Sequence, residues 1–231
     1  MSWLTRTLSS SVGKKLLMAT SGILLIVFLI GHLAGNLQLL MNDGGEAFNK
    51  YAHFMSTNGG VQITAWAFKL FFAVHIIWAV ILTINNRKAR GPHAYAKSKN
   101  SASSWASANM GLLGSLIFVF LVIHLAQFWG RVHYGSMPEV SYAGFNGGSP
   151  VKDLYLVVME AYQSPMWVAL YVISMAVLAY HLWHGFASAF QTLGVNNSKY
   201  TPIVKLLGYG YSIVVPALFA IIPVVMMAMG K

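Results

Sequence analysis

Five long apolar segments constrain this chain more than any other feature of its sequence. They cover about 16–40, 61–84, 104–130, 165–190 and 202–229 of the 231 residues. A helix that crosses a bilayer needs about 20 mostly apolar residues, and each segment reaches that length. Only 9% of the residues are charged, whereas a soluble domain carries about 25%. The sequence therefore predicts an all-α membrane protein, with one bundle of five transmembrane helices over residues 1–231.

The distribution of lysine and arginine predicts how this bundle is oriented. With the N-terminus inside, the inner segments hold ten basic residues and the outer segments hold four, while Lys69 falls within the second span. Cytoplasmic loops carry the excess of positive charge, so we expect a cytoplasmic N-terminus and an outside C-terminus. The bases lie between apolar segments, which favours membrane lipid over nucleic acid as a partner. The basic inner loop at 85–100 would attract anionic headgroups or an acidic partner.

Two outer segments have the repeat of an amphipathic helix. Apolar residues recur at positions 48, 51, 52 and 55, and again at 151, 154, 155 and 158. Ser149 and Pro150 are typical of an N-cap and a first helical residue, so we expect the second helix to begin there. Each helix would either lie in the membrane interface or pack on the end of the bundle.

Five of the eight histidines lie within the apolar segments, at positions 32, 75, 124, 181 and 184. Ionisable groups at that depth are costly and usually functional. At a rise of ~1.5 Å per residue, His32 and His124 lie roughly 24 and 30 Å from the inner end of their spans. His75 and His181 each lie roughly 15 Å from that end. The spacing therefore predicts one histidine pair in the outer half of the bilayer and another in the inner half.

Paired imidazoles on facing helices are a ligand set for haem iron. The chain has no cysteine, which excludes disulfides, iron–sulfur clusters, and thiolate-bound or covalently attached haem. We expect two haems b, the outer one on His32 and His124 and the inner one on His75 and His181. His184 lies three residues after His181 on a similar face, and it is an alternative fourth ligand.

A transporter or channel that uses histidines as proton relays or as ligands of divalent metals is the alternative from another class. Such a protein typically has intramembrane acids or broken helices. Pro216 and Pro223 are the only sign of a broken helix, and no acid lies within any expected span.

Several sequence motifs resemble one protein family. They are SSSVGKK at 9–15, GHLAGNLQ at 31–38, EAFNKYAHF at 46–54, HLWHGF at 181–186 and QTLG at 191–194. Together they resemble the cytochrome b subunit of bacterial succinate dehydrogenases and fumarate reductases, in its single-chain, five-helix, di-haem form. The likeness extends over nearly the whole chain.

The resemblance implies a subunit of the bacterial cytoplasmic membrane that anchors a flavoprotein subunit and an iron–sulfur subunit. As the quinone-reactive part of such an enzyme, the chain would serve the tricarboxylic acid cycle and the respiratory chain. Electrons from succinate would pass to the inner haem, to the outer haem and to a quinone, typically menaquinone; fumarate reduction uses the reverse path. The axial ligands carry over onto the four paired histidines, with His181 rather than His184 as the fourth.

Three further residues are candidates for roles around these cofactors. Lys69 would either pair with a propionate of the outer haem or extend to the outer interface. Glu46 and His53 are candidate proton acceptors for the quinone, or else solvated loop residues. Some quinol-oxidising relatives have a glutamate two residues before the fourth ligand, where this chain has Ala179. A di-haem b subunit of a hydrogenase or formate dehydrogenase is the alternative within redox proteins, and co-purification with a flavoprotein would distinguish the two.

Overall fold

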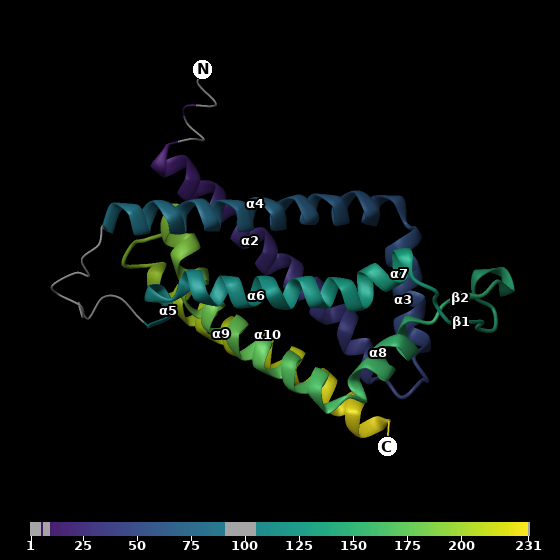
Figure 1. Cartoon of the computed structure of the whole chain (residues 1–231). Coiled ribbons are helices and arrows are strands. Elements are labelled where there is room, and N and C mark those ends of the chain that lie inside the picture. The colour runs from purple at the N-terminus through teal and green to yellow at the C-terminus, as the bar shows by residue number, and fades with distance from the viewer. Residues whose placement is uncertain (1–5, 7–9, 91–104, 231) are drawn as a thin grey trace. The chain divides into compact units, whose positions relative to one another are not determined.

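The computed structural model describes residue 6, residues 10–90 and residues 105–230, and about 83% of these described residues are helical. Figure 1 shows their arrangement along the chain. His93, Lys97 and Lys99 of the expected basic loop lie outside the described residues. The helices in chain order are α2 (Ser11–Asn36), η1 (Leu37–Leu40), α3 (Glu46–Thr57), α4 (Gly59–Arg90), α5 (Trp105–Ala108), α6 (Met110–His124), η2 (Leu125–Gly130), α7 (Arg131–Tyr134), η3 (Asn146–Gly148), α8 (Leu154–Tyr162), α9 (Pro165–Thr192) and α10 (Thr201–Met229). Two short strands, β1 (Glu139–Val140) and β2 (Val151–Lys152), pair antiparallel.

Five helical segments are long and apolar enough to cross a membrane, as the sequence predicts. They run over Ser11–Leu40, Gly59–Ala89, Met110–Tyr134, Pro165–Thr192 and Thr201–Met229. Large apolar side chains point outward along them; Ile63 is 74% exposed and Leu206 is 73% exposed. A soluble protein rarely leaves so many large apolar side chains uncovered. Lipid is the solvent that suits these surfaces.

The third span differs from the unbroken segment expected at 104–130. The helix is interrupted at Asn109, whose side-chain amide donates to the carbonyl of Trp105 at 2.9 Å. Asparagine competes with the helical backbone for hydrogen bonds in this way. Beyond His124 the chain winds as a π-helical turn, η2, before α7 completes the span. Hydropathy predicts neither the interruption at Asn109 nor the π-helical turn, because the residues around both are compatible with an ordinary α-helix.

The chain divides into two compact units, and the division cuts through the long helices. Unit 1 comprises Met1–Phe28, Ala67–Leu116 and Val177–Val214. Unit 2 comprises Leu29–Trp66, Ile117–Ala176 and Val215–Lys231. The single domain over 1–231 stays a prediction.

Aromatic contacts and long-range hydrogen bonds hold unit 1 together. The ring of Phe28 lies 5.3 Å from that of Phe72, and Trp183 stacks on Tyr209 at 4.2 Å between ring centres. The Tyr211 hydroxyl donates to the carbonyl of Ile26 at 2.7 Å, which joins α10 to α2. Aromatic pairs at such distances stabilise beyond the area that they bury.

In unit 2 the first amphipathic segment forms the expected helix, α3, but the second helix begins later than expected. Val151 and Lys152 belong to strand β2, and α8 starts after Asp153. The Asp153 carboxylate accepts from the backbone N–H of Leu156 at 2.9 Å, so Asp153 is the N-cap in place of Ser149. Pairing with β1 extends the backbone at 151–152 and delays the helix by one turn.

A buried asparagine fastens these outer elements to one another. Asn49 of α3 is 0% exposed. Its amide nitrogen donates to the Tyr142 hydroxyl at 2.9 Å and to Asp153 Oδ1 at 2.8 Å, and its amide oxygen accepts from the N–H of Tyr155 at 2.9 Å. Helix α3 also contacts α8, β2 and η1. The amphipathic helices of unit 2 therefore pack on each other.

Candidate functional site

The five intramembrane histidines are distributed over four helices. His32 lies on α2, His75 on α4, His124 at the end of α6, and His181 and His184 on α9. Each side chain is half-buried. His32 and His124 belong to unit 2, whereas the other three belong to unit 1.

In unit 2 the structure brings His32 and His124 together. Their ring centres are 5.8 Å apart, with the planes at 87°. Aromatic side chains surround the pair: Phe219 lies 5.6 Å from His32, and Phe128 lies 5.4 Å from His124. These apolar rings give the two imidazoles a surrounding of low polarity.

In unit 1 the structure brings His75 and His181 together. Their ring centres are 6.3 Å apart, with the planes at 68°. Two glycines face these rings. A Cβ on Gly22 would lie 3.4 Å from Cε1 of His75, and one on Gly114 would lie 3.8 Å from Cε1 of His181. The backbones of α2 and α6 therefore come close to the pair.

Two of the four paired imidazoles have a hydroxyl at Nδ1. Ser21 Oγ lies 3.2 Å from Nδ1 of His75 and also 3.1 Å from the Met18 carbonyl, to which it donates. The Tyr171 hydroxyl lies 3.2 Å from Nδ1 of His124 and donates to Gln127 Oε1 at 2.8 Å. Each hydroxyl gives its only proton elsewhere, so it accepts from the imidazole N–H. Nδ1 then carries the proton, and the lone pair of Nε2 is available to a metal.

The other two imidazoles have different surroundings. Nδ1 of His32 lies 3.4 Å from the amide nitrogen of Asn36, which donates to the His32 carbonyl at 2.7 Å. A separation of 3.4 Å is long for a hydrogen bond and does not determine the tautomer. Nδ1 of His181 and Nε1 of Trp78 are buried without a hydrogen-bond partner in the part of the chain that the structure describes. Buried polar atoms of this kind call for an explanation, such as a bound group.

These donor sets fit iron held between two imidazoles. An imidazole nitrogen binds a metal at about 2 Å, and the ring centre lies about 1 Å behind it, so two axial imidazoles have centres about 6 Å apart. The observed separations are 5.8 and 6.3 Å. The residues on 6, 10–90 and 105–230 form no group of three or more His, Cys, Asp or Glu side chains that would hold a bare metal ion.

The remaining sequence candidates lie elsewhere. It is the ring of His181, rather than that of His184, that contacts His75. Lys69 is half-buried on α4 and belongs to unit 1, whereas the outer pair belongs to unit 2. The role of Lys69 stays a prediction.

Glu46 and His53 lie on α3, outside both described pockets. The Glu46 carboxylate pairs with Lys50 at 2.6 Å on the surface of the helix, and the ring of His53 contacts that of Phe145 at 5.6 Å. Burial raises the pKa of the neighbouring Tyr51 phenol, which stays neutral at physiological pH. Both Glu46 and His53 are half-buried, and their role as proton acceptors stays a prediction.

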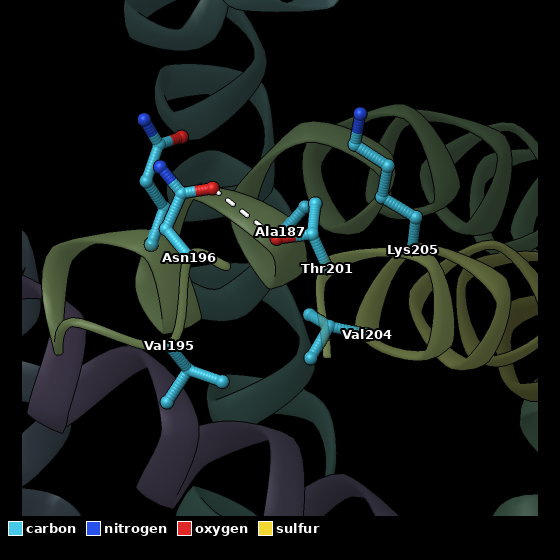
Figure 2. Close-up of a pocket in the computed structure, with 7 residues that line it drawn as sticks. Ala187, Val195, Asn196, Thr201, Val204 and Lys205 are labelled. Carbon is cyan, nitrogen blue, oxygen red and sulfur yellow. Dashed lines mark hydrogen bonds between the residues drawn. The ribbon is translucent and has the colours of Figure 1, made fainter. Parts of the chain in front are cut away.

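Two pockets of the described residues contain polar side chains. One has a volume of about 250 Å³ between α9 and α10 of unit 1; Figure 2 shows Lys205, Val204 and Val195 on its walls and the 3.2 Å hydrogen bond from Thr201 to Asn196. Lys205 is its only titratable residue. The other, of about 410 Å³ in unit 2, contains Gln127, Arg131 and Glu160.

Sequence reasoning missed Ser21, Tyr171 and Gln127. Ser21 and Tyr171 look like ordinary residues of apolar helices. The contact between Gln127 and Tyr171 joins residues 44 positions apart, so no local pattern indicates it. A glutamine three residues after a candidate ligand is a polar group at membrane depth, and that is the one signal by which it could have been found.

Comparison with protein-family models, curated proteins and solved structures finds no match for this chain. The resemblance described above therefore stays a prediction.

Proposed function

We propose that this chain is the di-haem cytochrome b anchor of a succinate:quinone oxidoreductase, and that it carries electrons between an iron–sulfur subunit and menaquinone. The observation that supports this most is the arrangement of four imidazoles from four helices in two pairs, 5.8 and 6.3 Å apart. These are the pairs that equal depth in the bilayer predicts.

The residues of this chain would bind and orient two haems b. His32 and His124 would hold the outer haem, and His75 and His181 the inner one. When bound between these imidazoles, haem would supply one-electron transfer. Tyr171 and Ser21 would fix the ring orientation of His124 and His75, because each accepts the Nδ1 proton.

The overall reaction that the complex would perform is balanced at both ends. Succinate gives fumarate, two electrons and two protons at the flavoprotein subunit, and the quinone takes up two electrons and two protons to become quinol. The chain lies in the bacterial cytoplasmic membrane in this proposal, with its N-terminus on the cytoplasmic side. The excess of inner lysine and arginine supports that orientation.

Haem content tests this proposal directly. The chain, expressed with its genomic neighbours and purified in detergent, should give two haems b per chain in a pyridine haemochrome assay and should co-purify with a flavoprotein. A clear deficit of haem would overturn the haem assignment. Two haems without a flavoprotein would instead favour the subunit of a hydrogenase or formate dehydrogenase.

A further inference from the structure

The pocket in unit 2 has the composition of a site for a polar aromatic ring. Its volume is about 410 Å³, within the range of about 300–1,000 Å³ that small-molecule sites occupy. Its walls come from η2, α7, α8 and the start of α9; the lining residues are Ala126, Gln127, Phe128, Arg131, Val157, Glu160, Ala161 and Trp167. Phe128 and Trp167 offer ring faces, while the three polar side chains offer hydrogen bonds.

Gln127 links this pocket to the outer histidine pair. Its Oε1 accepts the proton of Tyr171 at 2.8 Å, and the same hydroxyl lies 3.2 Å from Nδ1 of His124. Since Oε1 is turned toward Tyr171, the two hydrogens on Nε2 remain for another acceptor. The π-helical turn at Leu125–Gly130 places Gln127 there, and such turns are frequent at functional sites.

Arg131 and Glu160 provide a donor and a carboxylate in the same pocket. Their closest atoms are 3.8 Å apart, and their side chains are 43% and 55% exposed. A pair this long and this exposed is weakly held. Both groups are therefore free to turn toward a ligand.

We infer that this pocket binds the ring of a quinone, with Gln127 and Arg131 donating to its carbonyl oxygens and Glu160 exchanging protons with it. This inference rests on the proposed function, and it assigns to Glu160 the role for which the sequence offered Glu46 and His53. A quinone that becomes quinol takes two electrons and two protons, and both carbonyl oxygens gain an O–H bond. The electrons come from the redox chain of the complex, and the protons come from water through the Glu160 carboxylate. Quinol oxidation reverses each transfer.

Two measurements on the purified complex test the pocket. The first is photolabelling with an azido-naphthoquinone followed by peptide mapping, which needs no electron transfer. The second is the rate at which a short-chain naphthoquinone reoxidises the reduced haem, followed in the Soret band. Ala161→Phe fills the pocket without touching the Gln127–Tyr171–His124 hydrogen bonds, and Ala169→Phe on the exposed face of α9 is its matched control. Glu160→Gln removes the carboxylate, and Glu139→Gln on exposed β1 is its control.

We expect label in the peptides that contain residues 126–131 and 157–167. Ala161→Phe should abolish that labelling and slow reoxidation at least about tenfold, as expected for the loss of hydrogen bonds to a ligand. Glu160→Gln should slow reoxidation by a similar factor but keep the label, and both controls should behave as wild type.

The outcomes separate this inference from the proposed function. Label confined to other segments, or unchanged reoxidation in Ala161→Phe with the Soret band intact, would overturn the pocket while the di-haem function stands. A wild-type complex without a Soret band would overturn the function, and the labelling pattern alone would then decide whether the pocket binds quinone. If Ala161→Phe does not fold, Glu160→Gln against Glu139→Gln decides.

Discussion

The two units hold the same kind of histidine pair in different surroundings. In unit 1, His75 has Ser21 beside it, and the pair lies among apolar residues and glycines. All five acidic residues of the chain belong to unit 2, where the His124 ring connects through Tyr171 and Gln127 to a pocket with a carboxylate. Under the proposed function both pairs would hold a one-electron carrier, and the carboxylates that could exchange protons with a substrate lie in unit 2.

The largest expected effects come from removing one ligand of each pair. His75→Ala should lose the inner haem and His124→Ala the outer one, so each variant should retain about half of the haem per chain, since a haem with one axial ligand is weakly held. Both should lose succinate oxidation coupled to quinone, while oxidation coupled to a soluble dye persists at the flavoprotein subunit. Haem assays and the two activities, measured on the same preparations, check this.

His184→Ala is the matched control for the unit 1 pair. It should keep both haems, because its ring does not contact that of His75 as the ring of His181 does at 6.3 Å. Loss of one haem in His184→Ala, together with two haems in His181→Ala, would transfer the ligand role to His184.

Smaller effects are expected from the hydroxyls that face Nδ1. Tyr171→Phe removes the hydroxyl that lies at Nδ1 of His124, and Ser21→Ala removes the one that lies at Nδ1 of His75. Partners of metal ligands typically contribute 10–100-fold in affinity. In a redox titration of the haem absorbance, Tyr171→Phe should move the step of one haem and Ser21→Ala the step of the other.

A serine on the same helix as Tyr171 provides the control for that titration. The Ser174 hydroxyl donates to the Leu170 carbonyl at 2.7 Å, so Ser174→Ala should move neither step. If Tyr171→Phe and Ser21→Ala moved the same step, the two hydroxyls would not belong to separate haems.

Replacing a buried polar residue should lower the free energy of unfolding more in unit 2 than in unit 1. Asn49→Leu in unit 2 removes three hydrogen bonds that join separate elements, one of them to the Asp153 carboxylate. We expect a loss of about 3 kcal/mol in the free energy of unfolding. Ser212→Ala in unit 1 removes one bond, 3.0 Å long, to Tyr209 on the same helix, and we expect a loss below about 1 kcal/mol. Thermal unfolding in detergent measures both, and equal shifts in Tm would contradict the comparison.

The sequence predicts the histidine pairs because depth in a bilayer follows from counting residues along a helix. Equal depth on different helices is enough to group His32 with His124 and His75 with His181, and the structure joins the same pairs. The five spans follow from apolar length alone.

The features that the sequence does not predict depend on contacts between residues far apart in the chain, or on small local changes in backbone conformation. Asp153 becomes an N-cap only because β1 pairs with residues 151–152 and extends the chain before it. The π-helical turn cannot be predicted from hydropathy. It contains Gln127, whose Oε1 accepts the hydrogen bond from Tyr171. The polar contacts of the candidate site, such as that of Gln127 with Tyr171, therefore depend on tertiary structure. Its histidine pairs, in contrast, can be predicted from the number of residues along each span.

The smallest expected effect concerns Glu46, one of the two candidate proton acceptors that the sequence offered. Its carboxylate pairs with Lys50 one turn along α3, and their side chains are 43% and 34% exposed. Such exposed pairs contribute about 0.3–0.5 kcal/mol, so Glu46→Gln should barely change the Tm. Since Glu46 lines neither described pocket, the rate of haem reoxidation by a naphthoquinone should also stay at the wild-type value, in contrast to the slow rate expected of Glu160→Gln. Slowing in Glu46→Gln with an intact Soret band and with Glu160→Gln unaffected would return the proton-accepting role to α3.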